Sequence, residues 1–142
     1  IMHHRFASYG AYRGPIGGRL NGVMVAMEAG QVTAYALDQL AERGVMFVRP
    51  GEQVYEGQVV GEHCKDDDIV VNVTRQKKLT NMRAASKDAT VTLKAPRAVS
   101  LESALEYIEG DGLVELTPGS IRMRKRLLRE NDRRRLSRAA GA

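Results

Sequence analysis

The sequence predicts an α+β fold, with a small mixed β-barrel, packed helices, a C-terminal hairpin and a basic C-terminal helix. Two observations predict this class. Apolar runs of strand length recur between residues 23 and 73, where glycines and acidic residues divide them, and short strands at this spacing are typical of a small barrel. In two stretches, apolar residues recur at the spacing of an amphipathic helix. The chain has 142 residues, a length that suits one domain.

The strands are expected at the continuous apolar runs, because such runs are typical of buried strands. Gly57 and Gly61 suit the tight bends of a small barrel. A short strand at 91–93 is expected to return the chain to the sheet and to end before Pro96. The other predicted strands span 23–27, 45–48, 54–55, 58–63 and 69–73.

Two helices are expected from apolar positions at helical spacing. The first spans 32–43, and Gly44 suits its C-terminal end. The second begins after Ser100, whose hydroxyl suits an N-cap, and ends at Gly110 and Gly112. The inner face of the second helix is expected to hold Leu101, Ala104, Leu105 and Ile108.

The C-terminal part is expected to form a hairpin and then a basic helix. Two short runs, 113–116 and 121–124, flank Pro118-Gly119, which fits the centre of a type II turn. The basic tail, 125–142, is expected to be helical from its start. The inward-facing residues of this helix are expected to be Leu127, Leu128 and Leu136.

Residues 1–13 are expected to be a terminal strand that belongs to a preceding domain, because they are too short to fold alone. Glycine, proline and asparagine in 14–22 indicate a turn or linker, so the main domain is expected to cover 14–142. The chain opens at Ile1 rather than at an initiator methionine, and we therefore expect it to be a piece of a longer protein.

Charge is concentrated in two zones of the chain. Residues 75–97 carry seven cations and one acid, and residues 122–138 carry nine cations and two acids, so their net charges are +6 and +7. Since the whole chain has a net charge of +5, the remaining residues sum to −8. Two basic zones on an acidic body indicate binding surfaces for a polyanion.

The first zone contains the basic loop, residues 74–88, which is the main candidate site. Its apolar residues keep neither a helix nor a strand period, and long loops inside compact domains are usually functional or disordered. The alternative is a solvated loop whose lysines keep the protein soluble. The candidate RNA-binding residues of this loop are Arg75, Lys77, Lys78, Asn81, Arg83 and Lys87.

The second zone is expected to form a continuous basic surface where the hairpin meets the helix. Further arginines, Arg133 to Arg135, extend this surface. The alternative is a solvated helix face on which Glu130 and Asp132 are local partners of the arginines. The candidate RNA contacts of this zone are Arg122, Arg124, Lys125 and Arg126.

No catalytic, metal or cofactor site is predicted in this chain. The glycine-rich stretch 14–22 lacks the G-x-x-x-x-G-K-[ST] pattern of a phosphate-binding loop. His63, Cys64 and the acids at 66–68 match neither paired zinc ligands nor a calcium loop, and a thiol or metal enzyme remains as an alternative. A single cysteine excludes a disulfide framework, and no apolar run reaches the length of a membrane span.

Short motifs follow one another along nearly the whole chain. They include Arg19-Leu20-Asn21-Gly22-Val23, Glu28-Ala29-Gly30, Arg43-Gly44-Val45-Met46-Phe47, Val54-Tyr55-Glu56-Gly57, Val60-Gly61-Glu62-His63, Lys77-Lys78-Leu79-Thr80-Asn81-Met82-Arg83-Ala84, Leu105-Glu106-Tyr107-Ile108, Val114-Glu115-Leu116-Thr117-Pro118 and Ser120-Ile121-Arg122-Met123-Arg124-Lys125. This ordered series resembles the C-terminal region of the TypA/BipA family, which comprises bacterial ribosome-associated translational GTPases.

The resemblance implies a multi-domain parent whose GTPase domain, with its GTP and magnesium, lies upstream and is absent from this chain. Residues 1–13 resemble the end of the preceding elongation-factor-G-like domain. The remainder resembles the domain unique to the family, which is built partly on a barrel like the oligonucleotide-binding (OB) fold. The basic loop of that domain maps onto 74–88 and is expected to approach large-subunit rRNA and the tRNA acceptor end.

The resemblance also implies a cytoplasmic, monomeric, ribosome-binding protein with no membrane partner, active in ribosome assembly or in stress response. On its own the chain is expected to have no enzymatic activity. The alternative is a free-standing, OB-like protein that binds single-stranded nucleic acid. Aromatic residues make up only 5% of the chain, which leaves this alternative few surfaces on which bases can stack.

Overall fold

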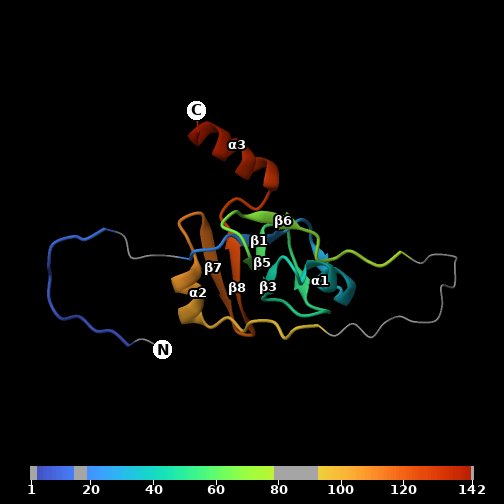
Figure 1. The fold of residues 1–142 in the computed structure, drawn as a ribbon, viewed down its shortest axis with the longest axis horizontal. Helices are drawn as coiled ribbons and strands as arrows, with labels where there is room; N and C mark the ends of the chain where they lie inside the picture. Colours follow the sequence, from blue (N-terminus) through green and yellow to red (C-terminus); the bar gives the residue numbers. More distant parts are fainter. Residues whose placement is uncertain (1–2, 15–18, 79–92, 142) are drawn as a thin grey trace.

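The computed structural model describes residues 3–14, 19–78 and 93–141. Among these residues it has three helices and eight strands, of which six form one central sheet (Figure 1) and β2 and β4 form a separate two-stranded sheet. In chain order the elements are β1 (Val23–Ala26), β2 (Gly30–Gln31), α1 (Ala34–Leu40), β3 (Gly44–Met46), β4 (Gln53–Val54), β5 (Gln58–His63), β6 (Ile69–Val71), α2 (Leu101–Tyr107), β7 (Gly112–Thr117), β8 (Ser120–Lys125) and α3 (Glu130–Ala140).

The main sheet has the strand order β6-β1-β5-β8-β7, and β3 also pairs with β5. All of its pairs are antiparallel except β1 with β6. β1 pairs with one edge of β5. Two strands pair with the other edge, β8 at Gln58 and Val59 and β3 at residues 61–63. The α+β class is confirmed. The described strands form an open path rather than a closed ring, so the small barrel stays a prediction.

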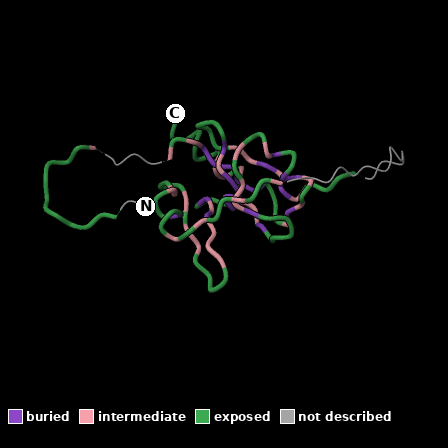
Figure 2. Tube along the Cα trace, turned by 60° about the horizontal axis from the view of Figure 1, so that its bottom comes forward, coloured by how far each residue is buried: buried purple, intermediate pink, exposed green. Residues whose placement is uncertain are grey.

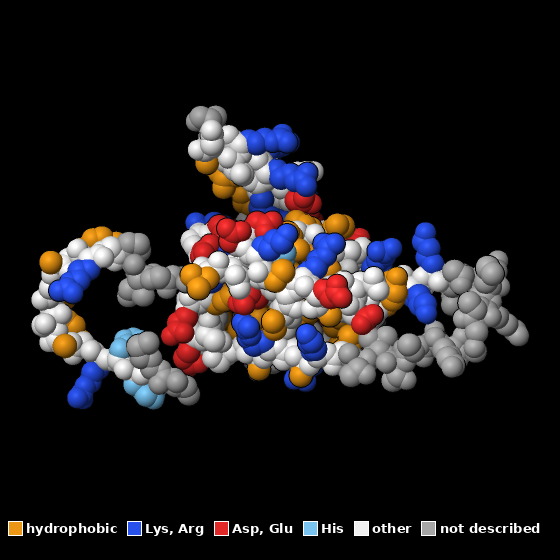
Figure 3. Space-filling model, in the orientation of Figure 1, with side chains coloured by type: hydrophobic (Ala, Val, Ile, Leu, Met, Phe, Trp, Pro, Cys, Tyr) orange, Lys and Arg blue, Asp and Glu red, His pale blue; other side chains and the backbone are white. Residues whose placement is uncertain are grey.

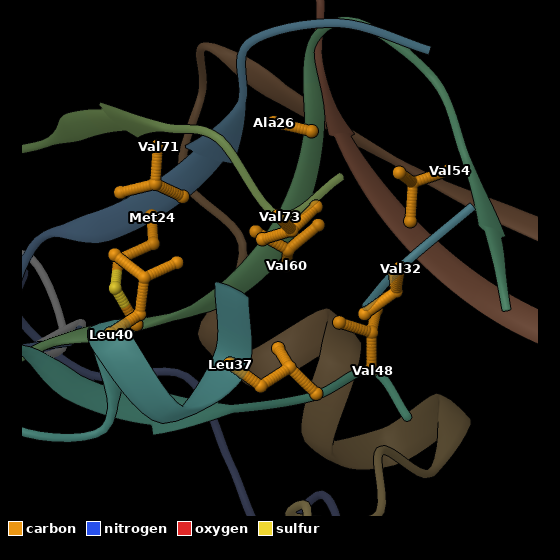
Figure 4. Close-up of a cluster of buried hydrophobic side chains, with 10 residues drawn as sticks. All are labelled: Met24, Ala26, Val32, Leu37, Leu40, Val48, Val54, Val60, Val71 and Val73. Atoms are coloured by element: carbon orange, nitrogen blue, oxygen red, sulfur yellow. The ribbon is translucent and has the colours of Figure 1, made fainter. Parts of the chain in front are cut away.

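Alternation along β1 divides the core between the two faces of the sheet, because successive strand side chains point to opposite faces. Met24 and Ala26 pack in a cluster that α1 covers (Figure 4). Val23 and Val25 pack in a second cluster that α2 covers through Ala104. Every residue of β1 is buried, and the buried segments gather at the centre of the trace in Figure 2.

The first helix is shorter than the predicted span of 32–43. It begins after Thr33, whose hydroxyl accepts a hydrogen bond from the N–H of Ala36 at 3.1 Å. Gly44 does not close the helix but begins β3, where a Cβ would lie 1.9 Å from the carbonyl oxygen of Glu62. Glycine at this position therefore allows two strands to approach each other.

The second helix begins where it was predicted. Ser100 is its N-cap, and the side chains of Ser100 and Ser103 form a reciprocal capping box. The predicted inner face is only partly correct, because Ala104 is buried whereas Leu105 is 59% exposed. A helix of seven residues makes about two turns, so it presents only a narrow stripe to the sheet.

The predicted hairpin is confirmed as β7 and β8, joined through Pro118 and Gly119. Gly119 lacks the positive φ that a type II turn requires, so the predicted turn type is wrong. The prediction of a helix from the start of the tail is also wrong. Lys125 is the last residue of β8, where its N–H donates to the carbonyl of Gly57 at 2.8 Å, and α3 begins only at Glu130.

The C-terminal helix projects away from the sheet (Figure 1). No residue of α3 is buried. None of the three leucines that were expected to face inward is buried, since Leu127, Leu128 and Leu136 are exposed by 37%, 39% and 61%. The basic segment is therefore helical only in part, and its apolar side chains cover no described core.

At the other end of the chain, residues 3–14 form no strand (Figure 2). Their aromatic side chains are exposed, including Tyr9 at 95%. A strand needs neighbours that accept its backbone hydrogen bonds, and no described strand pairs with this segment. The assignment of 1–13 to a preceding domain stays a prediction.

The predicted strand at 91–93 falls largely outside the described residues. Leu93 belongs to no strand, but it packs against the cluster under α1. No helix in the described part of the chain has the length and apolar character needed to cross a membrane.

Candidate nucleic-acid interface

The outgoing end of the basic loop is fastened to the N-terminus of α1. The backbone N–H of Thr33 donates to the carbonyl of Val73 at 3.0 Å. The hydroxyl of Thr33 donates to the carbonyl of Arg75 at 2.5 Å while it accepts from Ala36 as the helix cap. One threonine therefore fixes both the start of a helix and the direction in which the loop leaves the sheet.

Thr74 provides a second attachment at the same place. Its backbone N–H donates to Asn72 Oδ1 at 3.0 Å, and its hydroxyl lies 2.9 Å from both Asn72 Oδ1 and Glu28 Oε1. Since β6 ends at Val71, these bonds hold the chain for several residues beyond the strand. Gly30 lies against the Thr74 side chain, where a Cβ would come within 2.9 Å of its methyl carbon.

The chain that returns from the loop is attached beside β3 at Arg97. The N–H of Arg97 donates to the carbonyl of Met46 at 2.9 Å. Its guanidinium lies 3.1 Å from a carboxylate oxygen of Glu62 and 6.0 Å from the centre of the Phe47 ring. The chain is thus attached to the body at the start of the loop and again at Arg97 beyond it, and both described limbs extend away from the sheet on the same side (Figure 1).

The structure describes three of the six predicted contacts of the loop. Arg75, Lys77 and Lys78 are exposed and lie on the outgoing limb. Figure 3 shows Lys and Arg side chains along the described base of this projection. The other three predicted contacts, Asn81, Arg83 and Lys87, lie outside the described residues.

Lys125 is placed quite differently from the surface position predicted for it. Its side chain is only 4% exposed, and its Nζ lies 2.5 Å from an oxygen of Asp68 and 2.5 Å from an oxygen of Asp111. An RNA phosphate does not reach this ammonium group, because two carboxylates and the surrounding body already enclose it. We therefore do not retain Lys125 among the proposed contacts.

Asp68 is the centre of the ionic cluster around Lys125. It also accepts from the N–H of Val23 at 2.9 Å and lies 3.4 Å from the guanidinium of Arg19. Burial by itself would raise the pKa of Asp68. The hydrogen bonds from Lys125 and Val23, together with the charges of Lys125 and Arg19, outweigh burial and hold this pKa below its ordinary value.

Sequence reasoning missed this ionic cluster. The acids at 66–68 were interpreted only as a turn between strands, and the lysine that meets Asp68 is 57 residues away. A carboxylate before β6 and a cation on β8 carry no local pattern that pairs them. The one available signal was that Lys125 follows the alternation of Ile121 and Met123, which places it on the inner face of β8.

The other hairpin cations differ from one another. Arg124 Nε lies 2.8 Å from Glu115 Oε1, and the Tyr55 hydroxyl donates to the same carboxylate at 2.6 Å. Burial, followed by that hydrogen bond and the charge of Glu115, raises the pKa of Tyr55 above its ordinary value. The side chains of Arg122 and Arg126, in contrast, form no hydrogen bond or ion pair with any residue that the structure describes. Arg126 is exposed and Arg122 is half-buried.

The arginines of α3 are also divided. Arg133 donates to the carbonyls of Leu127 and Leu128, and Arg134 pairs with Glu130 one turn away. Arg135 and Arg138 are exposed and have no partner among the described residues. The predicted continuous basic surface is therefore interrupted, because internal partners already occupy several of its cations.

The His63 and Cys64 pair does not form a convergent site. His63 is buried, with Nδ1 2.7 Å from the carbonyl oxygen of Asp67, whereas Cys64 is exposed. Alternation along the chain explains this difference, since His63 is the last residue of β5. Within the described ranges, no group of three or more His, Cys, Asp or Glu residues could hold a metal ion.

Comparison with known proteins identifies the family. The family model described as the TypA/BipA C-terminal domain matches residues 21–130. A Bacillus subtilis protein named large ribosomal subunit assembly factor BipA is 50% identical over 134 residues, which cover 94% of this chain and 22% of that protein. The protein of the same name from Escherichia coli K12 is 48% identical over 140 residues, covering 98% of this chain and 23% of the relative.

The Synechocystis protein of the same name is 50% identical over 125 residues, covering 88% of this chain and 21% of the relative. The chain thus spans about a fifth of the length of the curated relatives it matches. Since the family model covers residues 21–130 and the relatives agree along nearly the whole chain, the chain belongs to the TypA/BipA family, in the region of its C-terminal domain.

Proposed function

We propose that this chain is a non-catalytic RNA-binding module through which a TypA/BipA-family protein docks on the large ribosomal subunit. The observation that carries the proposal is the outgoing limb of the basic loop, which is attached to the body through Thr33 and presents the exposed cations Arg75, Lys77 and Lys78. A loop held in this way can offer its charge in a fixed direction. That arrangement suits a partner with one fixed surface of phosphates.

The printed names of the relatives support the choice of partner, because they call those proteins assembly factors of the large ribosomal subunit. We extend this to contacts with large-subunit rRNA and the tRNA acceptor end, as the family resemblance implies. The cytoplasmic location, the monomeric state and the OB-like barrel belong to the same proposal. The proposal also includes a separate upstream domain that binds GTP and magnesium.

The contacts that we propose in the loop follow from its concentration of cations and, for Arg75, Lys77 and Lys78, from their exposure. In the loop they are Arg75, Lys77, Lys78, Asn81, Arg83 and Lys87. In the hairpin region we retain Arg122 and Arg126, which form no described ion pair. Arg124 is half-buried and bound to Glu115, so we assign it a secondary contribution only.

The test is the salt dependence of binding to purified large subunits. Each phosphate contact releases counterions, so log K should fall linearly with log salt. Replacing Lys77, Lys78 and Arg83 together with alanine should lower that slope by roughly two to three units, about one for each lost contact. Thermal melting should remain nearly unchanged, since exposed loop substitutions usually alter stability by less than about 0.5 kcal/mol.

A matched control removes three exposed cations from other parts of the body, Arg13, Arg43 and Lys65. This control has the same change in net charge, so it separates a local contact from general attraction. We expect its slope to change by less than one unit. Equal slopes for the two triple variants would reject the loop as the contact surface.

A further inference from the structure

A pocket of about 380 Å³ lies between the β7–β8 hairpin and the strands β4 and β5. Its volume falls within the range of roughly 300–1,000 Å³ that is usual for small-molecule sites. Apolar walls come from Phe47, Val99 and Ile121, and polar groups come from Gln58, Glu52 and Arg122. The pocket therefore combines flat apolar surface with a small number of polar groups.

Gln58 offers an unused hydrogen-bond donor to this pocket. The residue is only 4% exposed. Its Oε1 accepts from the N–H of Tyr55 at 3.3 Å, which fixes the orientation of the amide. Its NH₂ group donates to no residue in the described part of the chain. The NH₂ group is not one of the buried, unpaired polar atoms of the described residues, so it is open to the pocket and can donate to water or to a ligand acceptor.

Arg122 offers an unpaired cation to the same pocket. Two residues along the strand, Arg124 is bound by Glu115, whereas Arg122 forms no ion pair with a described residue. Glu52 likewise forms no side-chain hydrogen bond or ion pair within the described ranges. A ligand for this pocket should therefore present an anion to Arg122, an acceptor to Gln58 and a donor to Glu52.

We propose that the pocket binds one unpaired nucleotide of RNA. The phosphate contacts Arg122, and the base lies against Phe47 and Ile121. A carbonyl oxygen or ring nitrogen of the base accepts from Gln58, and an N–H of the base donates to Glu52. A nucleotide carries all of these groups on a planar ring, and single-stranded RNA is commonly recognised by combining base contacts with phosphate contacts.

The position of the pocket connects it to the basic loop. The returning limb of the loop is attached to β3 through Arg97 and Met46 and continues directly to Val99, which lines the pocket. An RNA strand whose phosphates lie along the loop can therefore follow this limb to the pocket. In this respect the inference rests on the proposed function and adds to it a place where a base is bound.

The test uses the whole 142-residue chain, titrated with each nucleoside 5′-monophosphate and followed by NMR of the backbone amides. Ribose 5-phosphate and inorganic phosphate are the matched probes without a base. We expect saturable shifts at Val99 and at residues 120–123 with nucleotides, and binding at least about tenfold weaker for the two probes without a base. Loss of the base removes its stacking and its hydrogen bonds, which together account for a factor of this size.

Two variants test the assigned roles. Arg122→Ala should weaken nucleotide binding about tenfold without unfolding the chain, because Arg122 has no described partner to lose. Gln58→Met removes the amide donor without adding a charge, so it should weaken nucleotides but not inorganic phosphate. Because it also removes the oxygen that accepts from Tyr55, a melting curve checks that the variant stays folded. Lys65→Ala, an exposed cation outside the proposed contacts, is the matched control and should leave nucleotide affinity unchanged.

Some results would overturn this inference. Equal shifts from nucleotides and ribose 5-phosphate would mean that no base is bound. Shifts from a capped Gly-Asp-Gly peptide, with none from nucleotides, would mean that the pocket is a peptide site. The variant that lacks Lys77, Lys78 and Arg83 should bind free nucleotides normally, so failure of the pocket and failure of the loop can be distinguished.

Discussion

The two basic zones of this chain differ in what holds them and in how much of their charge is available. The loop zone, 75–97, is attached at both ends, and its described cations on the outgoing limb are exposed, whereas Arg97 at its far end pairs with Glu62. The C-terminal zone, 122–138, has the larger net charge, +7 against +6. Yet three of its cations, Arg124, Lys125 and Arg134, are bound to carboxylates of the same chain.

This difference shows that net charge counts cations without regard to their partners. A lysine enclosed by two carboxylates adds to the net charge and nothing to the surface that an RNA meets. The zones also differ in attachment, since the loop begins at hydrogen bonds from Thr33 and Thr74 whereas α3 buries no residue. The loop is therefore the better candidate for a surface of fixed direction.

The largest effect is expected at the ionic cluster. Lys125→Met should lower the free energy of unfolding by about 2–3 kcal/mol, because it leaves Asp68 and Asp111 without their shared cation. Breaking a buried pair usually costs about 3–5 kcal/mol. The two carboxylates here are 36% and 56% exposed, so water replaces part of the loss. Urea denaturation measures this effect.

Arg126→Met is the control for that experiment, because Arg126 is the next residue and is exposed. We expect it to change the unfolding free energy by less than about 0.5 kcal/mol. Similar losses for the two variants would mean that the buried cluster contributes little. The comparison between enclosed and exposed cations would then fail.

The next effect is expected at the attachment of the loop. Thr33→Val keeps the shape of the side chain but removes the hydroxyl that caps α1 and donates to Arg75. The lost cap should cost about 1 kcal/mol of stability. The freed loop should bind large subunits roughly three- to tenfold more weakly. Binding must then order the loop, and the conformational entropy lost in that step lowers the affinity. Denaturation and subunit binding measure the two effects.

The charge of the loop is unchanged in this variant, so the salt slope of binding should equal that of the parent. Thr33→Ser is the matched control, because it keeps the hydroxyl and should retain both stability and affinity. An affinity equal to the parent in Thr33→Val would show that the attachment does not direct the loop.

A smaller effect is expected on the pH dependence of stability. The pKa of Asp68 is lower in the folded chain than in the unfolded one, so folding favours the charged form. Its contribution should be fully present above the ordinary pKa of about 4 and should disappear as the pH falls through the lower folded value. Urea denaturation at several pH values between about 2 and 6 should show this loss.

Asp68→Asn should make that acid dependence shallower, because the titrating group is gone. Asp66→Asn changes an exposed acid in the same turn, with no described side-chain partner, and should leave the dependence as it is in the parent. The same acid profile for both variants would contradict a special role for Asp68.

The smallest effect on stability is expected from removing α3. Ending the chain after Arg129 should change the unfolding free energy by less than about 0.5 kcal/mol, because no residue of the helix is buried. The truncation removes four arginines, one more cation than the loop triple variant. We nevertheless expect the truncation to lower the salt slope of subunit binding by less than the loop triple variant does. A larger decrease would make the helix the main contact.

The sequence by itself was enough for the elements whose signals are local. The apolar run at β1, the Ser100 cap of α2 and the β7–β8 hairpin appear where residue patterns predicted them. Each depends on neighbours along the chain, so composition and period determine it. The two basic zones are equally visible in the sequence, because charge needs no partner to be counted.

Tertiary structure alone decided which of those charges are available. The side chain of Lys125 is enclosed because β8 lies beside β5, which brings it to Asp68 and Asp111. Thr33 directs the loop only because β6 ends next to the start of α1. These contacts join residues between 14 and 57 positions apart. Pairing at such separations depends on how the sheet is ordered, and no local period in the sequence records that order.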